Sequence, residues 1–414
     1  MTAVIFHEPK AGMQVNTIIN KPQLQEGEFV ILIAMMMSLA ALAIDAVLPA
    51  LPAIGTTFGV ESGNTIQQVV GVLFLGLTIG QLIYGPLSDR FGRRSALFTG
   101  MLIFMAGSLL TIFSQDFTTM LAGRFSQGFG VAALRIVPLA IVRDKYEGTA
   151  MARVMSIAVA VFILVPCISP LLGQSILMVA EWQAIFWVLF VMSGIITVWF
   201  GLRQPETLHP SNRTAGGIKP ILQGVKVICT NRTTVAYIIV MGLLQGPFMG
   251  YIMTAEQIFH DVYHTGNLFA LYFASAAISI GIASLVNSQI VERLGMQKIC
   301  RIALLGSVLI SNFALTLEVM GILPFYGFLC ALAAIFFCFG LLLGNMNTIA
   351  LEPLGHIAGL ANSVISFMSG VIGLGIASMI GAAFNSSIQP LMFGVLITSL
   401  LSLVIVVWID QQKA

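Results

Sequence analysis

The sequence predicts an all-α integral membrane protein with about twelve membrane-spanning helices. Of its 414 residues, 58% are hydrophobic and only 9% are charged, whereas soluble domains carry roughly 25% charged residues. The apolar residues fall into runs that are long enough for a membrane helix, which needs about 20 residues at ~1.5 Å each. A soluble protein could not bury so much apolar surface, and a net charge of +2 does not indicate nucleic-acid binding.

Twelve apolar runs follow one another along the chain. The first six spans are expected near 29–51, 66–84, 96–114, 117–142, 154–178 and 183–201. The second six are expected near 234–256, 268–291, 299–318, 323–350, 357–383 and 390–409. Two runs, 117–142 and 323–350, exceed the minimum length, so these helices are expected to tilt or to protrude from the bilayer.

The basic residues predict the orientation, because Lys and Arg are retained on the cytosolic side. With the N-terminus inside, 17 of the 19 Lys and Arg residues fall in cytosolic tails and loops. The outside loops hold no Lys or Arg, and they carry the acidic residues Glu61, Asp116, Glu181, Asp261 and Glu318. Both termini are therefore expected in the cytosol.

The chain is expected to divide into two halves with a shared plan. The predicted parts are a cytosolic tail (1–28), a six-helix bundle (29–201), a cytosolic polar linker (202–233), a second six-helix bundle (234–409) and a short cytosolic tail (410–414). Asp89-Arg90-x-Gly92 follows the second span, and Glu292-Arg293-x-Gly295 follows the eighth, 203 residues later. Parallel halves of this kind are typical of alternating-access carriers.

Asp45 lies within the first predicted span and Arg124 and Arg135 within the fourth, although a mid-bilayer Asp costs roughly 2.5–3.5 kcal/mol. Asp45 lies ~9 Å and Arg124 ~10 Å from the outer ends of their spans. Because the two charges share a depth, a direct or water-bridged pair is expected. Arg135 follows eleven residues later on nearly the same face of the fourth span; it either binds a polar group of the substrate or extends toward the inner surface.

Four short motifs resemble those of the major facilitator superfamily. "GPLSDRFGRR" (85–94) resembles its loop between spans two and three, and "RFSQGFGVAA" (124–133) is similar to a fourth-span motif of proton-coupled drug exporters. "SPLLGQ" (169–174) resembles the fifth-span antiporter motif Gly-Pro-x-x-Gly-Gly, with Ser and Gln in place of the first and last Gly. "DAVLPALP" (45–52) resembles the first-span motif of the Bcr/CflA branch, which often has an Arg at the position of Leu139, whereas this chain has Arg135.

The resemblance implies the major facilitator fold and proton-coupled multidrug efflux, a drug/H⁺ antiport by alternating access. The implied setting is a monomer in a bacterial cytoplasmic (inner) membrane, with small amphipathic or lipophilic drugs and protons as its partners. The alternatives are a proton-coupled carrier of one metabolite, such as a sugar or siderophore, and a transporter-like sensor or scaffold.

Asp45 is the predicted proton carrier, with Arg124 tuning it. Burial favours the protonated, neutral form of a carboxyl group, and a nearby guanidinium favours the charged form. A conformational change that alters either one can therefore change the proton affinity of Asp45. The alternative is a static pair that fixes helix packing. Candidate substrate-binding residues are Arg135, Gln127, Met37, Gln245, Phe248 and Met249.

The predicted inner gate follows the second span and consists of Gly85, Asp89, Arg90, Gly92, Arg93, Arg94 and Asp144. Asp89 is expected to face the N-terminus of a neighbouring helix, where negative charge is favoured. The family resemblance implies that this neighbour is span eleven, which starts near Ile357, and Arg93 or Arg94 is expected to meet Asp144. Pro166, Pro170 and Gly173 are expected to shape the fifth span.

Other polar residues give weaker indications. Glu256 is expected near the outer surface, and Glu352 and His356 in a turn after span ten. No metal site or cofactor is expected, since the five Cys lack a CxxC spacing and the five His form no ligand series. The absence of a Walker loop argues against direct use of ATP.

Overall fold

The computed structural model describes residues 25–60, 63–213 and 218–413, and within these ranges it contains helices and turns but no strand. Eleven helical segments of the described chain are long and apolar enough to cross a membrane. A twelfth, α7 (Gly148–Leu177), has 30 residues and contains the shorter apolar stretch Leu164–Leu177. The predicted all-α membrane fold with about twelve spans is therefore confirmed.

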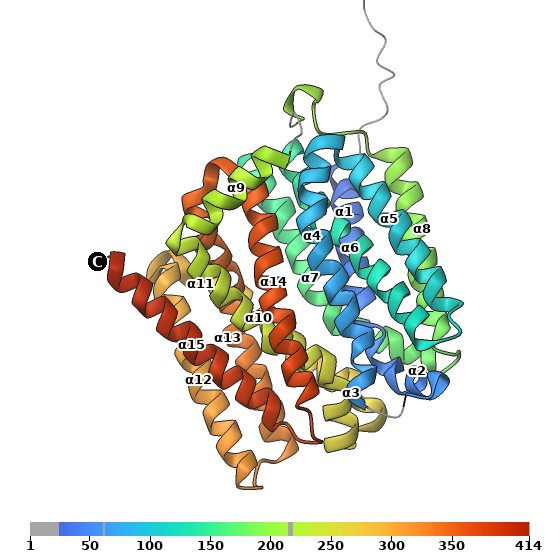
Figure 1. Ribbon diagram of the computed structural model, residues 1–414, viewed down its shortest axis with the longest axis vertical. Helices are drawn as coiled ribbons and strands as arrows, with labels where there is room; N and C mark the ends of the chain where they lie inside the picture. The colour runs from blue at the N-terminus through green and yellow to red at the C-terminus, as the bar shows by residue number, and fades with distance from the viewer. Residues whose placement is uncertain (1–24, 61–62, 214–217, 414) are drawn as a thin grey trace, which may run out of the picture.

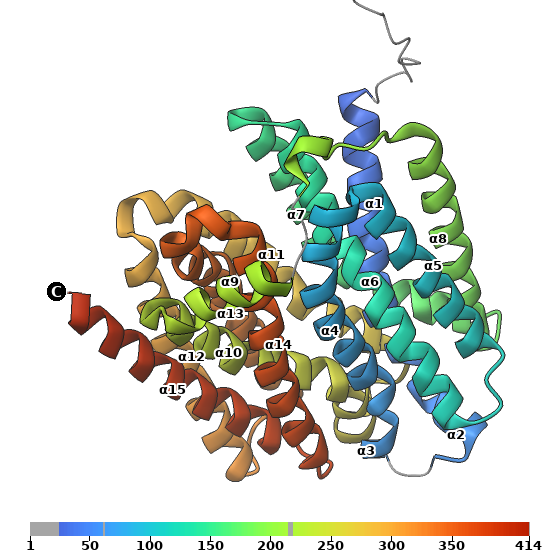
Figure 2. The same cartoon turned by 45° about the horizontal axis from the view of Figure 1, so that its top comes forward.

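The spans form two six-helix bundles that stand side by side (Figures 1 and 2). The N-terminal bundle comprises α1 (Glu26–Asp45), η1 (Leu48–Ala50), α2 (Leu51–Phe58), α3 (Gly63–Ile66), α4 (Gln68–Phe91), α5 (Arg93–Ile112), α6 (Phe117–Lys145), α7 and α8 (Gln183–Arg203). The C-terminal bundle comprises α10 (Arg232–Gln257), η3 (Ile258–Val262), η4 (Gly266–Leu268), α11 (Phe269–Leu294), α12 (Met296–Val319), α13 (Phe325–Leu351), η5 (Glu352–Ile357), α14 (Ala358–Ala382) and α15 (Gln389–Lys413).

The segment predicted as a polar linker contains η2 (Pro210–Asn212) and a 13-residue helix, α9 (Ile218–Thr230). Val225 and Ile228 lie three residues apart, so they share one helix face, and Ile228 is fully buried. Helix α9 packs against α14 and α10. Its apolar face explains why part of this segment is helical.

Helix α6 packs closely between α4 and α5 because glycines meet on both sides. A Cβ atom on Gly130 would lie 2.5 Å from the carbonyl oxygen of Gly100 in α5, and one on Gly128 would lie 2.0 Å from the carbonyl oxygen of Leu73 in α4. Small residues allow backbones to approach in this way within membranes. The fourth span is thereby held in the interior of the N-terminal bundle.

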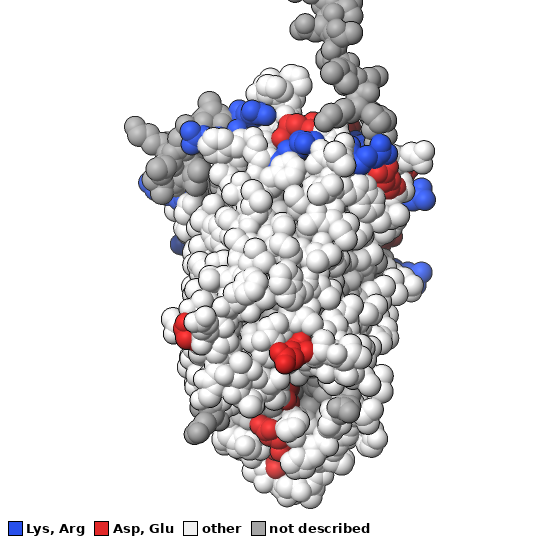
Figure 3. Space-filling model, turned by 90° about the vertical axis from the view of Figure 1, so that its right-hand side faces the viewer, with Lys and Arg blue, Asp and Glu red and all other residues white. Residues whose placement is uncertain are grey.

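The two ends of the molecule differ in charge (Figure 3). On this face Lys and Arg gather toward the end at which the chain passes from α4 to α5, together with some acidic side chains, and acidic side chains alone appear toward the other end. We call these the basic end and the acidic end. Which end faces the cytosol stays a prediction, and residues 1–24 of the predicted tail and Glu61 lie outside the described residues.

The sequence repeat has a structural counterpart. Gly92 is the single residue between α4 and α5, with φ of 98°, and Gly295 is the single residue between α11 and α12, with φ of 77°. Residues with a side chain rarely adopt these angles. Each half therefore uses a glycine to end one span and begin the next.

The two glycines differ in their surroundings, which gives a matched test. A Cβ atom at Gly92 would lie 2.4 Å from Oε2 of Glu206, whereas one at Gly295 would have nothing within 4 Å. We expect Gly295→Ala to lower the stability of the protein only through backbone strain, by roughly 1–2 kcal/mol. Gly92→Ala should lower the unfolding temperature further, because it also displaces Glu206. Thermal unfolding of both variants in detergent checks this, and equal losses would contradict it.

Candidate functional site

The first span breaks at Asp45. Helix α1 ends there, and the chain resumes a helical course through η1 and α2. Pro49 has no N–H to donate to the carbonyl of Asp45 four residues earlier, and its ring would clash with that carbonyl. On the other side of the break, Gly173 of α7 lies so close that a Cβ atom would be 2.0 Å from the carbonyl oxygen of Ala46. The break therefore places Asp45 at a helix end inside the protein.

Asp45 is covered by protein and does not face lipid. Its exposed fraction is 3%, and its Oδ1 atom has no hydrogen-bonding partner among the described residues. Two groups lie within the electrostatic range of its carboxylate: the thiol of Cys167 in α7 and the hydroxyl of Tyr251 in α10. Since η1 also packs against α10, the carboxyl group lies where the two bundles meet.

Arg124 is fully buried and bonded to neutral acceptors. Its guanidinium donates to the carbonyl of Val69 at 3.1 Å, to Oε1 of Gln127 at 2.8 Å and to the carbonyl of Ala43 at 3.1 Å. The ring of Phe186 lies 5.6 Å from its Cζ atom. The last carbonyls of a helix lack intrahelical donors and attract cations, so Arg124 stabilises the broken end of α1.

A direct ion pair of Arg124 with Asp45 is not formed in this structure. No ion pair within 4.0 Å joins them among the described side chains. The guanidinium instead binds the Ala43 carbonyl, two residues before the acid. The depth estimate placed the two residues at one level, but it did not determine the direction of either side chain about its helix axis.

The predicted substrate-binding residues differ in their exposure. Gln127 is fully buried, and its Nε2 donates to Oγ of Ser108 at 2.8 Å, which favours a packing role. Met37 and Met249 are also buried, with exposed fractions of 4% and 8%. Arg135 is exposed at the middle of α6.

Gln245 and Phe248 occupy different surroundings on α10. Gln245 is half-buried and approaches Oγ of Ser369 in α14 at 3.5 Å. The ring of Phe248 stacks on that of Phe339 in α13, with centroids 4.7 Å apart. Phe248 is therefore the candidate that lines a pocket.

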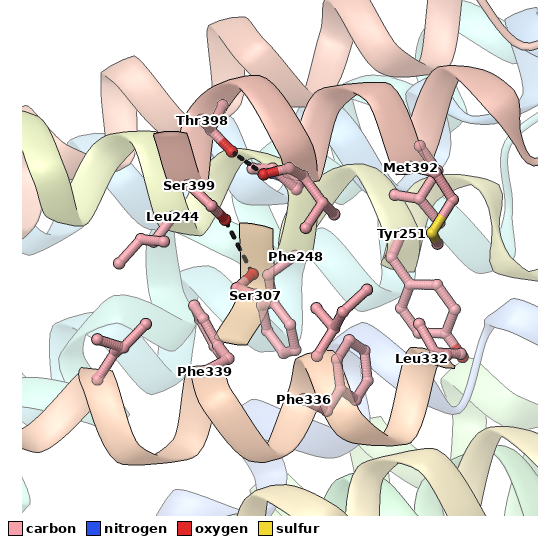
Figure 4. A pocket seen from close by; sticks show the side chains of 15 residues that line it. Leu244, Phe248, Tyr251, Ser307, Leu332, Phe336, Phe339, Met392, Thr398 and Ser399 are labelled. Carbon is pink, nitrogen blue, oxygen red and sulfur yellow. Dashed lines mark hydrogen bonds between the residues drawn. The ribbon is translucent and has the colours of Figure 1, made fainter. Parts of the chain in front are cut away.

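That pocket lies inside the C-terminal bundle, between α10, α12, α13 and α15 (Figure 4). Its lining is mainly apolar and aromatic, with a hydrogen bond of 2.9 Å between the hydroxyls of Ser307 and Ser399. The lining residues are Leu244, Pro247, Phe248, Tyr251, Ser307, Leu332, Ile335, Phe336, Phe339, Leu342, Leu391, Met392, Val395, Thr398 and Ser399. The sequence predicted only Phe248 among these lining residues. The others are mainly apolar and cannot be distinguished in the sequence from ordinary residues of a membrane helix.

The predicted gate residues form a charged cluster at the basic end. Arg93 donates from Nε to Oδ2 of Asp144 at 2.8 Å and from Nη1 to Oγ of Ser88 at 2.8 Å, and it also pairs with Asp89. A Cβ atom on Gly359, the second residue of α14, would lie 3.9 Å from Oδ2 of Asp89. The predicted contact of Arg93 with Asp144 and the predicted position of Asp89 beside the start of span eleven are thus present.

Other members of the predicted gate have separate positions. A Cβ atom on Gly85 would lie 2.2 Å from Oγ of Ser363 in α14, so this glycine allows the two bundles to touch. Arg90 is exposed, with its Cζ atom 4.9 Å from the ring of Phe91. Arg94 donates to the carbonyl of Gly201 at 3.0 Å.

Glu206 belongs to this cluster, although sequence reasoning missed it. Its carboxylate accepts from the backbone N–H of Arg93 at 2.9 Å and of Arg94 at 3.1 Å. It thereby caps the N-terminus of α5, where negative charge is favoured. Thr207 adds a hydrogen bond to Asp144 at 3.0 Å. The loop after α8 therefore ties α5 and α6 together.

Neutral side chains join the two bundles near the acidic end. Gln67 of the N-terminal bundle donates to Gln257 of the C-terminal bundle, and both are buried. Asn64 donates to the carbonyls of Phe384 at 3.2 Å and Ala382 at 3.3 Å. We call Asn64, Gln67 and Gln257 the polar clasp. Sequence reasoning missed it, because uncharged residues far apart in the chain give no pattern.

The remaining candidates are more isolated. Pro166 and Pro170 lie inside α7, which continues through both. Glu256, near the end of α10, has an exposed fraction of 8% and is thus more buried than an outer-surface position suggests. Glu352 is exposed at the start of η5, and the side chain of His356 lies outside the described residues.

Comparison with known proteins supports the fold and the type of protein. Residues 33–378 match the family described as Major Facilitator Superfamily. The chain is 28% identical to the uncharacterized MFS-type transporter YdgK of Bacillus subtilis, over 84% of this chain and 87% of that one. It is 24% identical to the bicyclomycin resistance protein homolog of Haemophilus influenzae, over 88% and 92% of the two chains. It is also 24% identical to multidrug resistance protein D of Escherichia coli, over 92% and 94%.

A solved structure shows the same fold at low sequence identity. The crystal structure of a D-xylose-proton symporter superposes with a TM-score of 0.70 at 13% identity, over 90% of this chain and 97% of that one. The matched family covers most of the chain, including both bundles and the sites at their contact. The chain belongs to the major facilitator superfamily, and it is a multi-pass membrane transporter that resembles the Bcr/CflA branch of that family, not an enzyme.

Proposed function

We propose that this protein exports small amphipathic or lipophilic drugs in exchange for protons, by alternating access and with Asp45 as the proton carrier. The observation that carries the proposal is a buried carboxyl group at a broken helix between the two bundles, with one oxygen atom that no described residue binds. An ionisable residue inside a membrane protein is by default a functional candidate. The bicyclomycin resistance and multidrug resistance relatives favour drugs as the substrates.

The geometry gives Asp45 a way to respond to conformation. The carboxyl group lies between elements of both bundles, namely the break of α1, α7 and α10. When one bundle tilts against the other, the separation of α1 from α10 changes, and so does access of water to the acid. Hydration favours the charged carboxylate and burial the neutral acid. Asp45 can therefore take up a proton in one state and release it in the other.

The contacts between bundles supply two gates. At the acidic end, the polar clasp joins α3 and the start of α4 to the last residue of α10 and to the end of α14. At the basic end, Asp89 and Gly85 lie against α14, and Arg93 holds Asp89 next to Asp144. Alternating access requires these two sets of contacts to break in turn. The proposed orientation places the basic end and both termini in the cytosol, with the protein acting as a monomer in a bacterial cytoplasmic membrane.

The proposed substrate contacts combine one polar and several apolar groups. Arg124 contacts α1 and α4, and Arg135 lies eleven residues along α6, which returns to within about 20° of the same face. Arg135 is exposed on that side, where it can meet a polar group of the drug. Gln245 and the aromatic residue Phe248 are the proposed contacts from α10.

A resistance profile with a controlled proton gradient tests the proposal. Cells that overexpress the protein should tolerate several chemically unrelated drugs better than cells with an empty vector, and an uncoupler should remove the difference. A response to a single sugar or siderophore would replace the proposal with a metabolite carrier. If purified protein in liposomes moves no solute under a proton gradient, the chain is a sensor or scaffold.

A further inference from the structure

Tyr251 stands out among the buried groups that the proposed mechanism does not yet use. Its exposed fraction is 1%, and its hydroxyl has no hydrogen-bonding partner among the described residues. A buried hydroxyl without a partner costs roughly as much as a lost hydrogen bond. Asp45 has an oxygen atom in the same condition. The two groups belong to different bundles, but Tyr251 lies in the same buried cluster as Ala43 and Ala46, which flank Asp45, and η1 packs against α10.

The ring of Tyr251 is held firmly in place. It stacks on Phe273 of α11, with centroids 5.6 Å apart and planes 18° apart, and it meets Phe336 of α13 edge-on at 5.0 Å. These contacts fix the ring, while the hydroxyl at its tip rotates freely. The same residue also lines the aromatic pocket of the C-terminal bundle (Figure 4). Tyr251 thus lies between that pocket and the acid.

The charged groups described on the helices around Asp45 are bonded to other residues or lie further along their helices. From α6, Arg124 is bonded to Val69, Gln127 and Ala43, and Arg135 lies ~16 Å further toward the basic end. From α7, Cys167 is buried, and from α8 the charge of Arg203 is bound to Glu28 at 2.8 Å. Glu256 of α10 lies five residues beyond Tyr251, about 140° around the helix.

We propose that Tyr251 is a positioning residue for proton exchange, whose hydroxyl donates a hydrogen bond to the charged carboxylate of Asp45. The bond forms through one water molecule or, after rotation of the Asp45 side chain, directly. It links α10 to the break of α1, so it exists only while the bundles are close at this level. The inference rests on the proposed role of Asp45. It adds a residue of the C-terminal bundle whose distance from Asp45 changes when the two bundles move.

The proposed hydrogen bond makes the proton affinity of Asp45 depend on which end of the protein is closed. A hydrogen bond donated to a carboxylate favours its charged form. With the acidic end closed, Tyr251 therefore promotes release of the proton from Asp45. When the bundles part at that end, the bond is lost and Asp45 takes up a proton more readily from the acidic side. This sequence matches proton entry at the acidic end and release at the basic end.

Infrared difference spectroscopy of the purified protein tests the link without a transported ligand. The carbonyl stretch of protonated carboxylic acids is followed against pH, and the Asp45 band is identified by its loss in Asp45→Asn. In Tyr251→Phe the midpoint of this band should rise by about one pH unit, because the charged form loses a donor. The ring packing is retained, and thermal unfolding should show unchanged or higher stability because the deleted hydroxyl is unpaired.

Tyr237→Phe is the matched control. Tyr237 lies on the same helix, is equally buried and also has a hydroxyl without a partner among the described residues, but it is about 21 Å away along α10. In Tyr237→Phe, the pH midpoint of the Asp45 band should equal that of the unmodified protein. An unchanged or lowered midpoint in Tyr251→Phe, or an equal rise in both variants, would overturn the inference. A shift specific to Tyr251 in a protein that exports no drug would leave the inference standing and remove only the proposed function.

Discussion

Replacing Asp45 with asparagine is expected to abolish proton-driven export while leaving a folded protein. Asparagine has nearly the same shape and cannot change its charge between pH 5 and pH 8, so the proposed proton exchange has no carrier. The side chain is buried with an unpaired oxygen, so removing its ionisable group should not reduce stability. Proteoliposomes with an imposed pH gradient and ethidium as the transported probe measure the effect, and Asp45→Asn should fall to the rate of empty liposomes.

Two comparisons separate coupling from binding. Exchange of ethidium across the membrane without a pH gradient should persist in Asp45→Asn, because alternating access with bound substrate needs no net proton movement. Glu256→Gln removes another largely buried carboxyl group, from the C-terminal bundle, and should retain proton-driven export. Full export by Asp45→Asn under the gradient would refute the role of Asp45, whereas loss of both activities would assign it to folding or substrate binding.

The overall architecture was predictable because it depends on patterns within short stretches of sequence. A membrane helix must satisfy its backbone hydrogen bonds within itself, so long apolar runs locate the spans. The repeat was visible for a similar reason, since a residue with positive φ at the junction of two spans is nearly always glycine. Gly92 and Gly295 occupy that junction in the two halves.

The candidate site was only partly predictable, because it depends on how helices rotate and pack. Depth along a helix follows from residue counting, which placed Asp45 and Arg124 at one level. The direction of each side chain follows from the break at Pro49 and from close backbone contacts such as those of Gly128 and Gly173. Those contacts turn Arg124 to the Ala43 carbonyl and leave one oxygen of Asp45 without a bonding partner among the described residues.

The contacts that sequence reasoning missed share a physical cause. The Gln67–Gln257 bond joins residues 190 positions apart, and Glu206 caps a helix that begins 113 positions earlier. In neither case are the two residues close enough in the sequence for their spacing to predict the contact. Neutral amides and a loop carboxylate are common at any helix end, so only the packed structure distinguishes these from the others.

Replacing Gly173 with alanine is expected to lower the stability of the protein, because the added methyl group would overlap the backbone at the break of α1. The added Cβ atom would lie 2.0 Å from the carbonyl oxygen and 2.9 Å from the carbonyl carbon of Ala46. Both are backbone atoms, so no side-chain rotation can relieve the overlap, and α7 must move away from the break in α1. Overpacking of this kind typically costs roughly 1–3 kcal/mol, which should appear as a lower unfolding temperature in detergent.

The same displacement should impair transport, because the break that Gly173 supports also positions Asp45. Gly375→Ala is the control: it adds the same methyl group within α14, where nothing lies within 4 Å of the new atom. Alanine favours a helix over glycine by about 1 kcal/mol, so this variant should be as stable as the unmodified protein or more so. A Gly173→Ala protein that matched Gly375→Ala in stability and in proton-driven export would show that α7 does not hold the broken helix in place. The unusual conformation around Asp45 would then have to be maintained by Pro49 of η1 and by the bond from Arg124 of α6 to the carbonyl of Ala43.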